Sequence, residues 1–261
     1  MNILLVGCGN MGGAMLAGWL AGGMAAGSFT VVDPVLPEAP TGVTLLREVP
    51  AQAFDVVLLG FKPQQFAEAS TPTVAPNTIV LSILAGVDLA TLRKRFPQAG
   101  AIVRVMPNLA AAMGKSSIGL FGDGDAAARP MVDSLMAPLG TAEWLSDEAL
   151  MDVVTALAGS GPAFIYRMID ALATGAAALG LPRDQADRLA LGMVEGAGVL
   201  AAASPLAPGE LADRVASPGG TTRAGLDVLD AEGRLFALIA ETLRAARDRG
   251  VAMAAEARAK N

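Results

Sequence analysis

The sequence contains no histidine and only one cysteine, Cys8, among its 261 residues. Without histidine the chain cannot build a Ser–His–Asp triad, a Cys–His dyad or a histidine metal site, and we expect no metal. Any proton transfer must use a hydroxyl, a lysine, a carboxylate or water. A single cysteine cannot form an internal disulfide, which fits a reducing compartment. We therefore expect a cytoplasmic protein.

Basic residues are also scarce. The 19 lysines and arginines are outnumbered by 25 acidic residues, which gives a net charge of −6. The first basic residue is Arg47, so the apolar opening segment lacks the basic region that a signal peptide needs. An acidic chain without a basic patch is a poor candidate for binding nucleic acid or an anionic membrane. We expect a small-molecule substrate, with no nucleic acid and no membrane as partner.

Apolar residues, in contrast, make up 53% of the chain, enough for a sizeable core in one large or two smaller domains. The apolar stretch Val153–Leu181 carries Arg167 and Asp170 centrally and is interrupted at Gly159–Pro162. Charges and breaks of this kind argue against a membrane span. The pattern favours a helix that is buried on several sides.

The chain opens with "MNILLVGCGNMGGAML", in which a short apolar run meets three glycines. The run predicts a buried parallel strand, and the following "GCGNMG" has the spacing G-x-G-x-x-G at the start of a predicted helix. Such glycines allow a tight turn and close approach of a pyrophosphate, and the helix N-terminus offers free N–H groups. The residues that we expect to hold a pyrophosphate are Gly7, Gly9, Asn10, Met11 and Gly12.

An acidic residue follows at the expected distance. "SFTVVD" predicts a second strand that ends in Asp33, 21 positions after Gly12, where the ribose-binding acid of a dinucleotide site is found. Asp33 would accept a hydrogen bond from a ribose 2′-OH and repel a 2′-phosphate, and "VVDPVLPEAP" supplies no basic residue to offset that charge. The cofactor is predicted to be NAD(P)H, with Asp33 favouring NADH.

The rest of the chain divides into two halves. Strand-like runs recur at 42–46, 54–60, 78–84, 101–106, 116–121 and 142–145, and helix-like segments lie between them at Gln64–Ala69, Asp88–Phe96 and Asp125–Met136. This alternation predicts an α/β fold with a mostly parallel, doubly wound sheet covered by helices on both faces. Beyond it, apolar residues recur at helical spacing, in helices expected from Pro162, at Arg183–Ala203, at Pro208–Val215 and at Glu232–Arg258.

We therefore expect a dinucleotide-binding domain over residues 1–146 and an all-α domain over residues 147–261. The second half is too small to bury so much apolar surface by itself. A subunit interface is the economical explanation, and a homodimer is the default expectation.

Four further motifs are unusual for core sequence: "GFKPQ" (60–64), "RVMPN" (104–108), "GSGPAF" (159–164) and "SPGGTT" (217–222). Together with "GCGNMG" they resemble the pyrroline-5-carboxylate reductases, from Gly7 to about Leu226. The resemblance implies a Rossmann domain followed by a helical dimerisation domain, and dimers or rings of dimers. It also implies reduction of 1-pyrroline-5-carboxylate to L-proline by NADPH or NADH. Two departures are Leu109–Ala110 after "RVMPN" and Ala207–Pro208 in place of a histidine–proline pair.

The resemblance also implies roles for individual residues. The cofactor side is implied for Phe61, Lys62, Pro63, Gln64 and Asn108. The substrate side is implied for Met106, Pro107, Ser160, Gly161, Gly219, Gly220, Thr221 and Thr222. Thr222 matches the catalytic threonine proposed to hydrogen-bond the ring nitrogen. A solvated surface role for Lys62, and a plain helix start for "SPGGTT", are the structural alternatives.

Two other functions fit the nucleotide loop. One is a related dehydrogenase acting on an imine or a hydroxy acid; hydroxy-acid enzymes of this kind commonly use a lysine as acid or base, yet none occurs between Lys115 and Lys260. The other is a regulator that binds NAD(P)H without turnover. Assay with pyrroline-5-carboxylate and with hydroxy acids separates the three.

Overall fold

The computed structural model describes residues 1–123 and 128–258, without the side chains of 256–258. Contacts divide the chain into two compact units, one formed by Met1–Ser160 with Ala246–Asn261 and the other by Gly161–Ala245. The long last helix, α9 (Arg234–Arg258), contributes residues to both. The first unit contains the β-sheet, and the second unit is helical.

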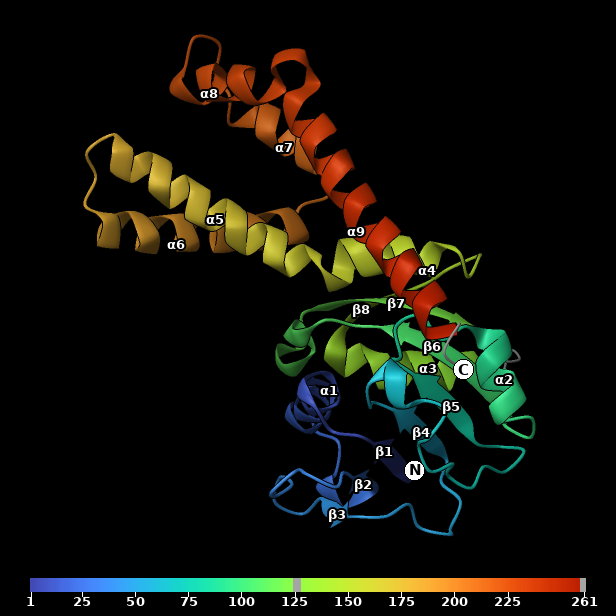
Figure 1. Ribbon diagram of the computed structural model, residues 1–261. Helices are drawn as coiled ribbons and strands as arrows, with labels where there is room; N and C mark the ends of the chain where they lie inside the picture. The colour runs from blue at the N-terminus through green and yellow to red at the C-terminus, as the bar shows by residue number, and fades with distance from the viewer. Residues whose placement is uncertain (124–127, 259–261) are drawn as a thin grey trace. The chain divides into compact units, whose positions relative to one another are not determined.

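The described residues of the first unit form one eight-stranded sheet with the order β3-β2-β1-β4-β5-β6-β7-β8 (Figure 1). The strands are β1 (Ile3–Val6), β2 (Phe29–Val32), β3 (Thr44–Leu46), β4 (Val56–Leu59), β5 (Ile79–Ser82), β6 (Ala101–Met106), β7 (Ser116–Gly122) and β8 (Gly140–Trp144). Neighbouring strands are parallel except β6 and β7. The predicted mostly parallel sheet is confirmed, and the chain reverses its direction of winding between β1 and β4.

Helices cover both faces of this sheet, as predicted. On one face α1 (Asn10–Ala21) and α3 (Ala128–Met136) bury Trp19 and Leu135 against alternate strand residues such as Leu5. On the other face α2 (Leu89–Arg95) buries Leu92 against residues such as Leu4. Successive residues of a strand point to opposite faces, so strands buried on both sides are apolar throughout.

Local sequence determines several of these elements. β6 spans the range 101–106 that the sequence predicts. All six of its residues are buried, which explains why the run is almost entirely apolar. Asp88 caps α2 by accepting a 2.8 Å hydrogen bond from the N–H of Thr91, as predicted. The predicted helix Gln64–Ala69 is wrong: only a 3₁₀ turn, Pro63–Gln65, forms there. A six-residue segment does not repay the cost of helix nucleation. The predicted helix start at Asp125 lies outside the described residues.

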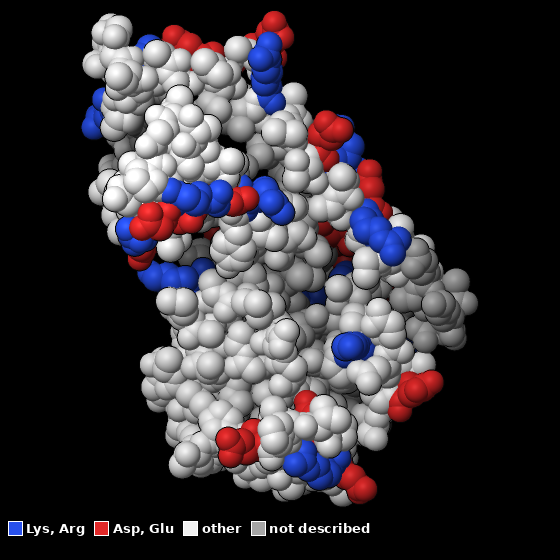
Figure 2. Space-filling view, turned by 60° about the vertical axis from the view of Figure 1, so that its left-hand side comes forward, with Lys and Arg blue, Asp and Glu red and all other residues white. Residues whose placement is uncertain are grey.

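The second unit contains α5 (Gly161–Ala178), α6 (Arg183–Ala203), α7 (Pro208–Arg214), α8 (Thr221–Asp230) and the first part of α9. α5 and α6 pack through small residues, with Ala173, Ala186 and Ala190 at the centre. α5 ends at Ala178, and Gly180 in the turn that follows has a φ of +103°, the positive range that glycine favours after a helix. Arg183 then bonds Asp170 and Asp187, each at 2.8 Å, and Figure 2 shows basic and acidic groups side by side on this unit.

The start of α9 depends on backbone geometry. α9 starts at Arg234 rather than at the expected Glu232, because Glu232 has a φ of +55° that no helix accommodates. Across the described residues, no single helix is both long and apolar enough to cross a membrane; α6 and α7 together meet that test of length and composition, but are bent by 115°.

Candidate functional site

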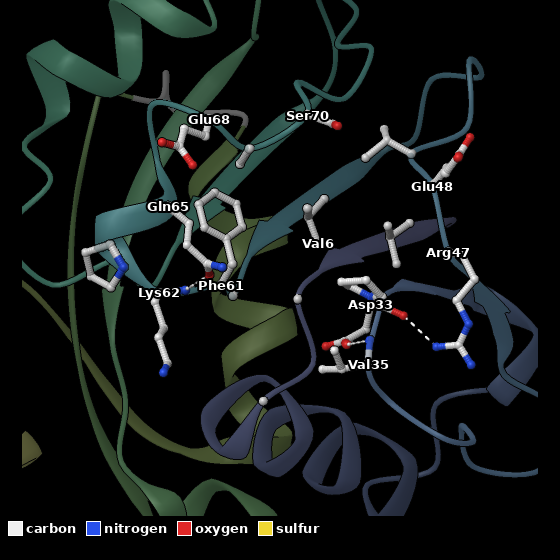
Figure 3. Close-up of a pocket in the computed structure, with 18 of the residues that line it drawn as sticks. Val6, Asp33, Val35, Arg47, Glu48, Phe61, Lys62, Gln65, Glu68 and Ser70 are labelled. Atoms are coloured by element: carbon white, nitrogen blue, oxygen red, sulfur yellow. Dashed lines mark hydrogen bonds between the residues drawn. The ribbon is translucent and has the colours of Figure 1, made fainter. Parts of the chain in front are cut away.

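A cavity of about 960 Å³ lies at the carboxyl ends of β1, β2 and β4, entirely within the first unit (Figure 3). Its walls come from the glycine loop, the segment after β2, the segment after β3 and the segment after β4. In open α/β sheets ligands bind at the point where the winding of the chain reverses. The cavity occupies that point, between β1 and β4.

The glycine loop forms the floor of this cavity. Gly7 has a φ of +87°, and a Cβ there would lie 2.6 Å from the backbone N of Phe61. Gly9, in contrast, has nothing within 4 Å of an added Cβ and lines the cavity. The loop must therefore pass close to β4 at Gly7 and leave open space at Gly9.

The first turn of α1 adds donors to that floor. Gly9 is its N-cap residue, and no side chain caps it. Helical bonding begins where Gly13 N–H donates to Gly9 O at 2.7 Å, which leaves the N–H groups of residues 10–12 outside the helical ladder. These N–H groups and the positive end of the helix dipole suit a diphosphate. The donor set therefore fits the dinucleotide predicted from the sequence.

Asp33 lies at the end of β2 and lines the same cavity, but its carboxylate is turned toward the backbone. Oδ2 accepts a 2.9 Å hydrogen bond from Cys8 N–H, and Oδ1 accepts two of 2.9 Å from Val35 and Leu36 N–H. Burial alone would raise the pKa of Asp33. The three N–H donors and the nearby positive charge of Arg47 outweigh burial and lower that pKa. Asp33 is therefore an ionised brace between two loops.

Cys8 lies beside this carboxylate. Burial, and then the negative charge of Asp33, raise the pKa of its thiol. A protonated, buried thiol is a poor nucleophile.

The segment after β4 forms the opposite wall. Gly60, Phe61, Lys62 and Pro63 line the cavity. Gln65 also lines it, and its Oε1 accepts a 3.2 Å hydrogen bond from the N–H of Lys62. The expected Gln64 is exposed and is not among the lining residues. The 3₁₀ turn points its neighbour into the cavity instead.

The "RVMPN" motif follows β6, where Met106 and Asn108 are buried. The side chain of Asn108 accepts a 3.0 Å hydrogen bond from Ala110 N–H and donates one of 3.0 Å to Ala158 O. It thereby holds the segment that leads to Ser160, which ends a π-helical turn. Neither Asn108 nor Pro107 is among the residues that line the 960 Å³ cavity.

The remaining predicted residues belong to the second unit. Gly161 starts α5, and Gly219 adopts a φ of +71° in the turn before α8. Gly220 is the N-cap of α8 without a side-chain cap, and Thr221 and Thr222 occupy its exposed first turn. "SPGGTT" is thus a helix start with open N–H groups, which is compatible with both the anion-binding and the plain structural interpretation.

Sequence reasoning gave no role to Arg47 or Val35, and it included Gly60 only as the first residue of "GFKPQ"; all three line the cavity. Gly60 directly follows the apolar strand β4. A Cβ at Gly60 would lie 2.6 Å from Gly7 O, so the close approach of the two loops requires glycine there. Arg47 belongs to no motif, and only the fold brings it beside Asp33. Within the ranges that the structure describes, no group of three or more His, Cys, Asp or Glu side chains is placed to hold a metal ion.

Comparison with known proteins adds to this geometry. The family model described as pyrroline-5-carboxylate reductase dimerisation matches residues 148–253. The pyrroline-5-carboxylate reductase of Pseudomonas aeruginosa is 34% identical over 97% of both chains. That of Methanosarcina acetivorans is 34% identical over 94% of this chain and 95% of its own. The solved reductase of Coxiella burnetii superposes with a TM-score of 0.83, at 29% identity over 95% of this chain and 97% of its own.

Proposed function

Because this chain belongs to the pyrroline-5-carboxylate reductase family, we propose that it reduces 1-pyrroline-5-carboxylate to L-proline with NADH or NADPH. The observation that carries the proposal is likeness over the whole length of curated relatives. The cavity at the reversal of the sheet supports it, because its glycine loop and helix N-terminus suit a dinucleotide. The chain is accordingly an oxidoreductase that acts on a C=N bond.

The cofactor side of the site is assigned to the first unit. The N–H groups at the start of α1 would hold the diphosphate, and Phe61, Lys62 and Pro63 would border the nicotinamide end. When bound, the reduced nicotinamide supplies the hydride that saturates the C=N bond. Met106 and Pro107 are proposed to shape the adjoining wall, with Asn108 fixing the loop between them and Ala158. Gln64 keeps only the support of the family resemblance.

The substrate side is assigned to Ser160, Gly161 and the start of α8. The uncapped N-terminus of α8 suits a carboxylate, which would accept hydrogen bonds from the N–H groups that follow Gly220. The hydroxyl of Thr222 is proposed to orient the ring nitrogen. A threonine hydroxyl is too weak an acid to donate its proton fully, and the sequence holds no histidine to replace it. We therefore assign the proton on the nitrogen to water.

The assembly is proposed to be a homodimer through the domain of residues 147–261, with rings of dimers as a larger form. The matched dimerisation model covers residues 148–253. In the single chain, large apolar side chains of α6 such as Leu189 and Leu200 are 62% and 72% exposed, and a partner subunit would cover apolar surface of this kind. Light scattering on the purified chain measures the subunit number directly. A cytoplasmic location, where NAD(P)H is available, is part of the same proposal.

One absorbance assay tests the function. Oxidation of NADH or NADPH is followed with 1-pyrroline-5-carboxylate as substrate, and reduction of NAD⁺ or NADP⁺ is followed with hydroxy acids. We expect turnover in the first assay and none in the second. Turnover of hydroxy acids would favour the dehydrogenase alternative, and cofactor binding without turnover of either would favour a regulator.

A further inference from the structure

The carboxylate of Asp33, at the end of β2, is mostly engaged by the protein itself, because three of its about four acceptor sites take backbone N–H groups. A ribose-reading aspartate must offer a carboxylate oxygen to the 2′-OH. Here both oxygens of Asp33 accept hydrogen bonds from backbone N–H groups, at 2.9 Å in each case. The residue is only 7% exposed. Its position in the sequence matches a ribose ligand, but its hydrogen bonds match a brace for the loop.

A cation stands beside this braced carboxylate. Arg47 follows β3, and its Nη1 donates to Asp33 O at 2.8 Å and to Leu36 O at 2.6 Å. Both acceptors are neutral carbonyls, and in the described part of the chain Arg47 makes no ion pair within 4.0 Å. A guanidinium has five N–H donors in a fixed fork, so Nε and Nη2 keep three beyond the two on Nη1. Arg47 is thus fixed in position while it retains its charge.

The position of Arg47 relates it to the adenosine end of a dinucleotide. Arg47, Asp33 and Val35 line the same cavity as the glycine loop. With a diphosphate at the start of α1, an adenosine ribose would lie near the end of β2. Figure 3 shows the side chain of Arg47 bent toward Asp33, while the adjacent Glu48 extends away from it. Arg47 therefore brings a positive charge to this end of the cavity, beside the ionised carboxylate of Asp33.

We propose that this site selects a ribose 2′-phosphate, so that the enzyme prefers NADPH, and that Arg47 is the residue that sets the preference. This proposal rests on the dinucleotide site of the proposed function. It reverses the preference for NADH that the sequence position of Asp33 suggests. Guanidinium and phosphate match in geometry and form charge-assisted hydrogen bonds, and the three N–H groups bonded to Asp33 weaken the repulsion that its carboxylate exerts on a phosphate.

Binding measurements test the assignment without turnover. Dissociation constants for NADPH, NADH and adenosine 2′,5′-bisphosphate are measured by calorimetry on the wild-type chain, on Arg47→Met and on Arg188→Met. Arg188 is an exposed arginine whose ion pair with Asp184 lies within α6, so it is the matched control. We expect wild type to bind NADPH at least tenfold more tightly than NADH. Arg47→Met should lose tenfold or more for NADPH and for the bisphosphate and stay within about threefold for NADH.

Three results would overturn the proposal. They are a wild-type preference for NADH, a preference for NADPH that survives in Arg47→Met, and an equal loss for both cofactors in that variant. The second result would assign the 2′-phosphate to a group other than Arg47. A further variant, Arg47→Lys, keeps the charge without the fork and should retain part of the preference if the variant chain folds as wild type does.

The outcome is separable from the proposed reaction. Selective NADPH binding without reduction of pyrroline-5-carboxylate would support the role of Arg47 and contradict the proposed activity. Reduction of pyrroline-5-carboxylate with better binding of NADH would support the proposed activity and contradict the role of Arg47.

Discussion

The backbone N–H of Cys8 donates a 2.9 Å hydrogen bond to the carboxylate of Asp33, which is 25 residues later in the chain. The bond joins the loop after β1 to the end of β2, and the same carboxylate also holds the turn at Val35 and Leu36. Two walls of the cavity are thereby fixed to each other before any ligand arrives. Preorganisation of this kind lowers the ordering cost of binding.

Replacing Asp33 with asparagine should destabilise the first unit. An amide has one acceptor oxygen and one NH₂ donor group, so either Cys8 N–H or the pair at Val35 and Leu36 would face a donor. A buried N–H left without an acceptor costs about 1–3 kcal/mol. We expect the free energy of unfolding, measured with urea, to fall by about that amount.

Asp147→Asn is the matched control for that substitution. Asp147 accepts one 2.9 Å hydrogen bond, from Ala149 N–H, at an exposed position, and an amide oxygen replaces that acceptor. Its stability should stay within about 0.5 kcal/mol of wild type. Equal stability of wild type and Asp33→Asn would show that the brace contributes nothing.

The lowered pKa of Asp33 predicts a dependence of stability on pH. A carboxyl whose pKa is lower in the folded state stabilises the fold fully above its unfolded pKa, about 3.9. That stabilisation is lost as the pH falls through the lower, folded pKa. The stability difference between wild type and Asp33→Asn should therefore be constant from about pH 7 to 5 and shrink below about pH 4. Urea unfolding of both proteins along this pH series measures it, and a difference that grows on acidification would contradict the assigned direction.

The sequence predicts β1, the glycine loop and the start of α1 well, because these elements depend on properties of neighbouring residues. The apolar run before Gly7 becomes β1, and "GCGNMG" becomes the loop and first turn of α1, because strand burial and glycine geometry are local properties. The sequence spacing also places Asp33 at the end of β2. It does not reveal which way a short carboxylate turns, since that depends on N–H groups of Cys8 and Val35 that only the fold brings near.

Long-range pairing explains most of what the sequence does not predict. Arg47 lies 14 residues from Asp33, and no motif marks it as a neighbour of the cavity. The antiparallel pairing of β6 with β7 likewise cannot be predicted from the sequence, because an apolar strand can pair in either direction. The predicted helix from Gln64 is also wrong. Helix propensity is a local property, whereas the 3₁₀ turn that forms there belongs to a cavity wall that only the fold creates.

Two glycines of the loop should respond differently to substitution by alanine. At Gly7 the positive φ and a Cβ only 2.6 Å from Phe61 N predict a loss of both stability and cofactor affinity. At Gly9 the φ is −70° and no atom lies within 4 Å of the added Cβ. Gly9→Ala should keep the thermal midpoint within a few degrees and still weaken NADPH binding, because its methyl group stands at the edge of the cavity.

Differential scanning fluorimetry and calorimetry separate these two effects. Gly27→Ala, at another position with nothing within 4 Å of the added Cβ and outside the cavity lining, should change neither. Unchanged NADPH affinity in Gly9→Ala would remove the glycine loop from the cofactor site.

Removal of the Thr222 hydroxyl should affect the reaction and spare the cofactor. A hydrogen bond that orients a charged ring nitrogen contributes about 1.5–3 kcal/mol, and 1.36 kcal/mol is a tenfold change in rate. Thr222→Ala should therefore lower kcat/KM for pyrroline-5-carboxylate by tenfold or more, while the Kd for NADPH stays within about twofold. Thr222→Ser keeps the hydroxyl and should recover most of the activity.

Thr242→Ala controls for loss of a threonine from an exposed helix, since its hydroxyl donates only to Leu238 O within α9, at 2.8 Å, among the described contacts. It should leave kcat/KM unchanged. If Thr222→Ala also leaves kcat/KM unchanged, Thr222 has no part in the reaction, and the start of α8 reverts to a plain helix start. If the alanine and serine variants lose activity equally, the hydroxyl is not what the site uses, and the methyl group of Thr222 must shape the substrate pocket instead.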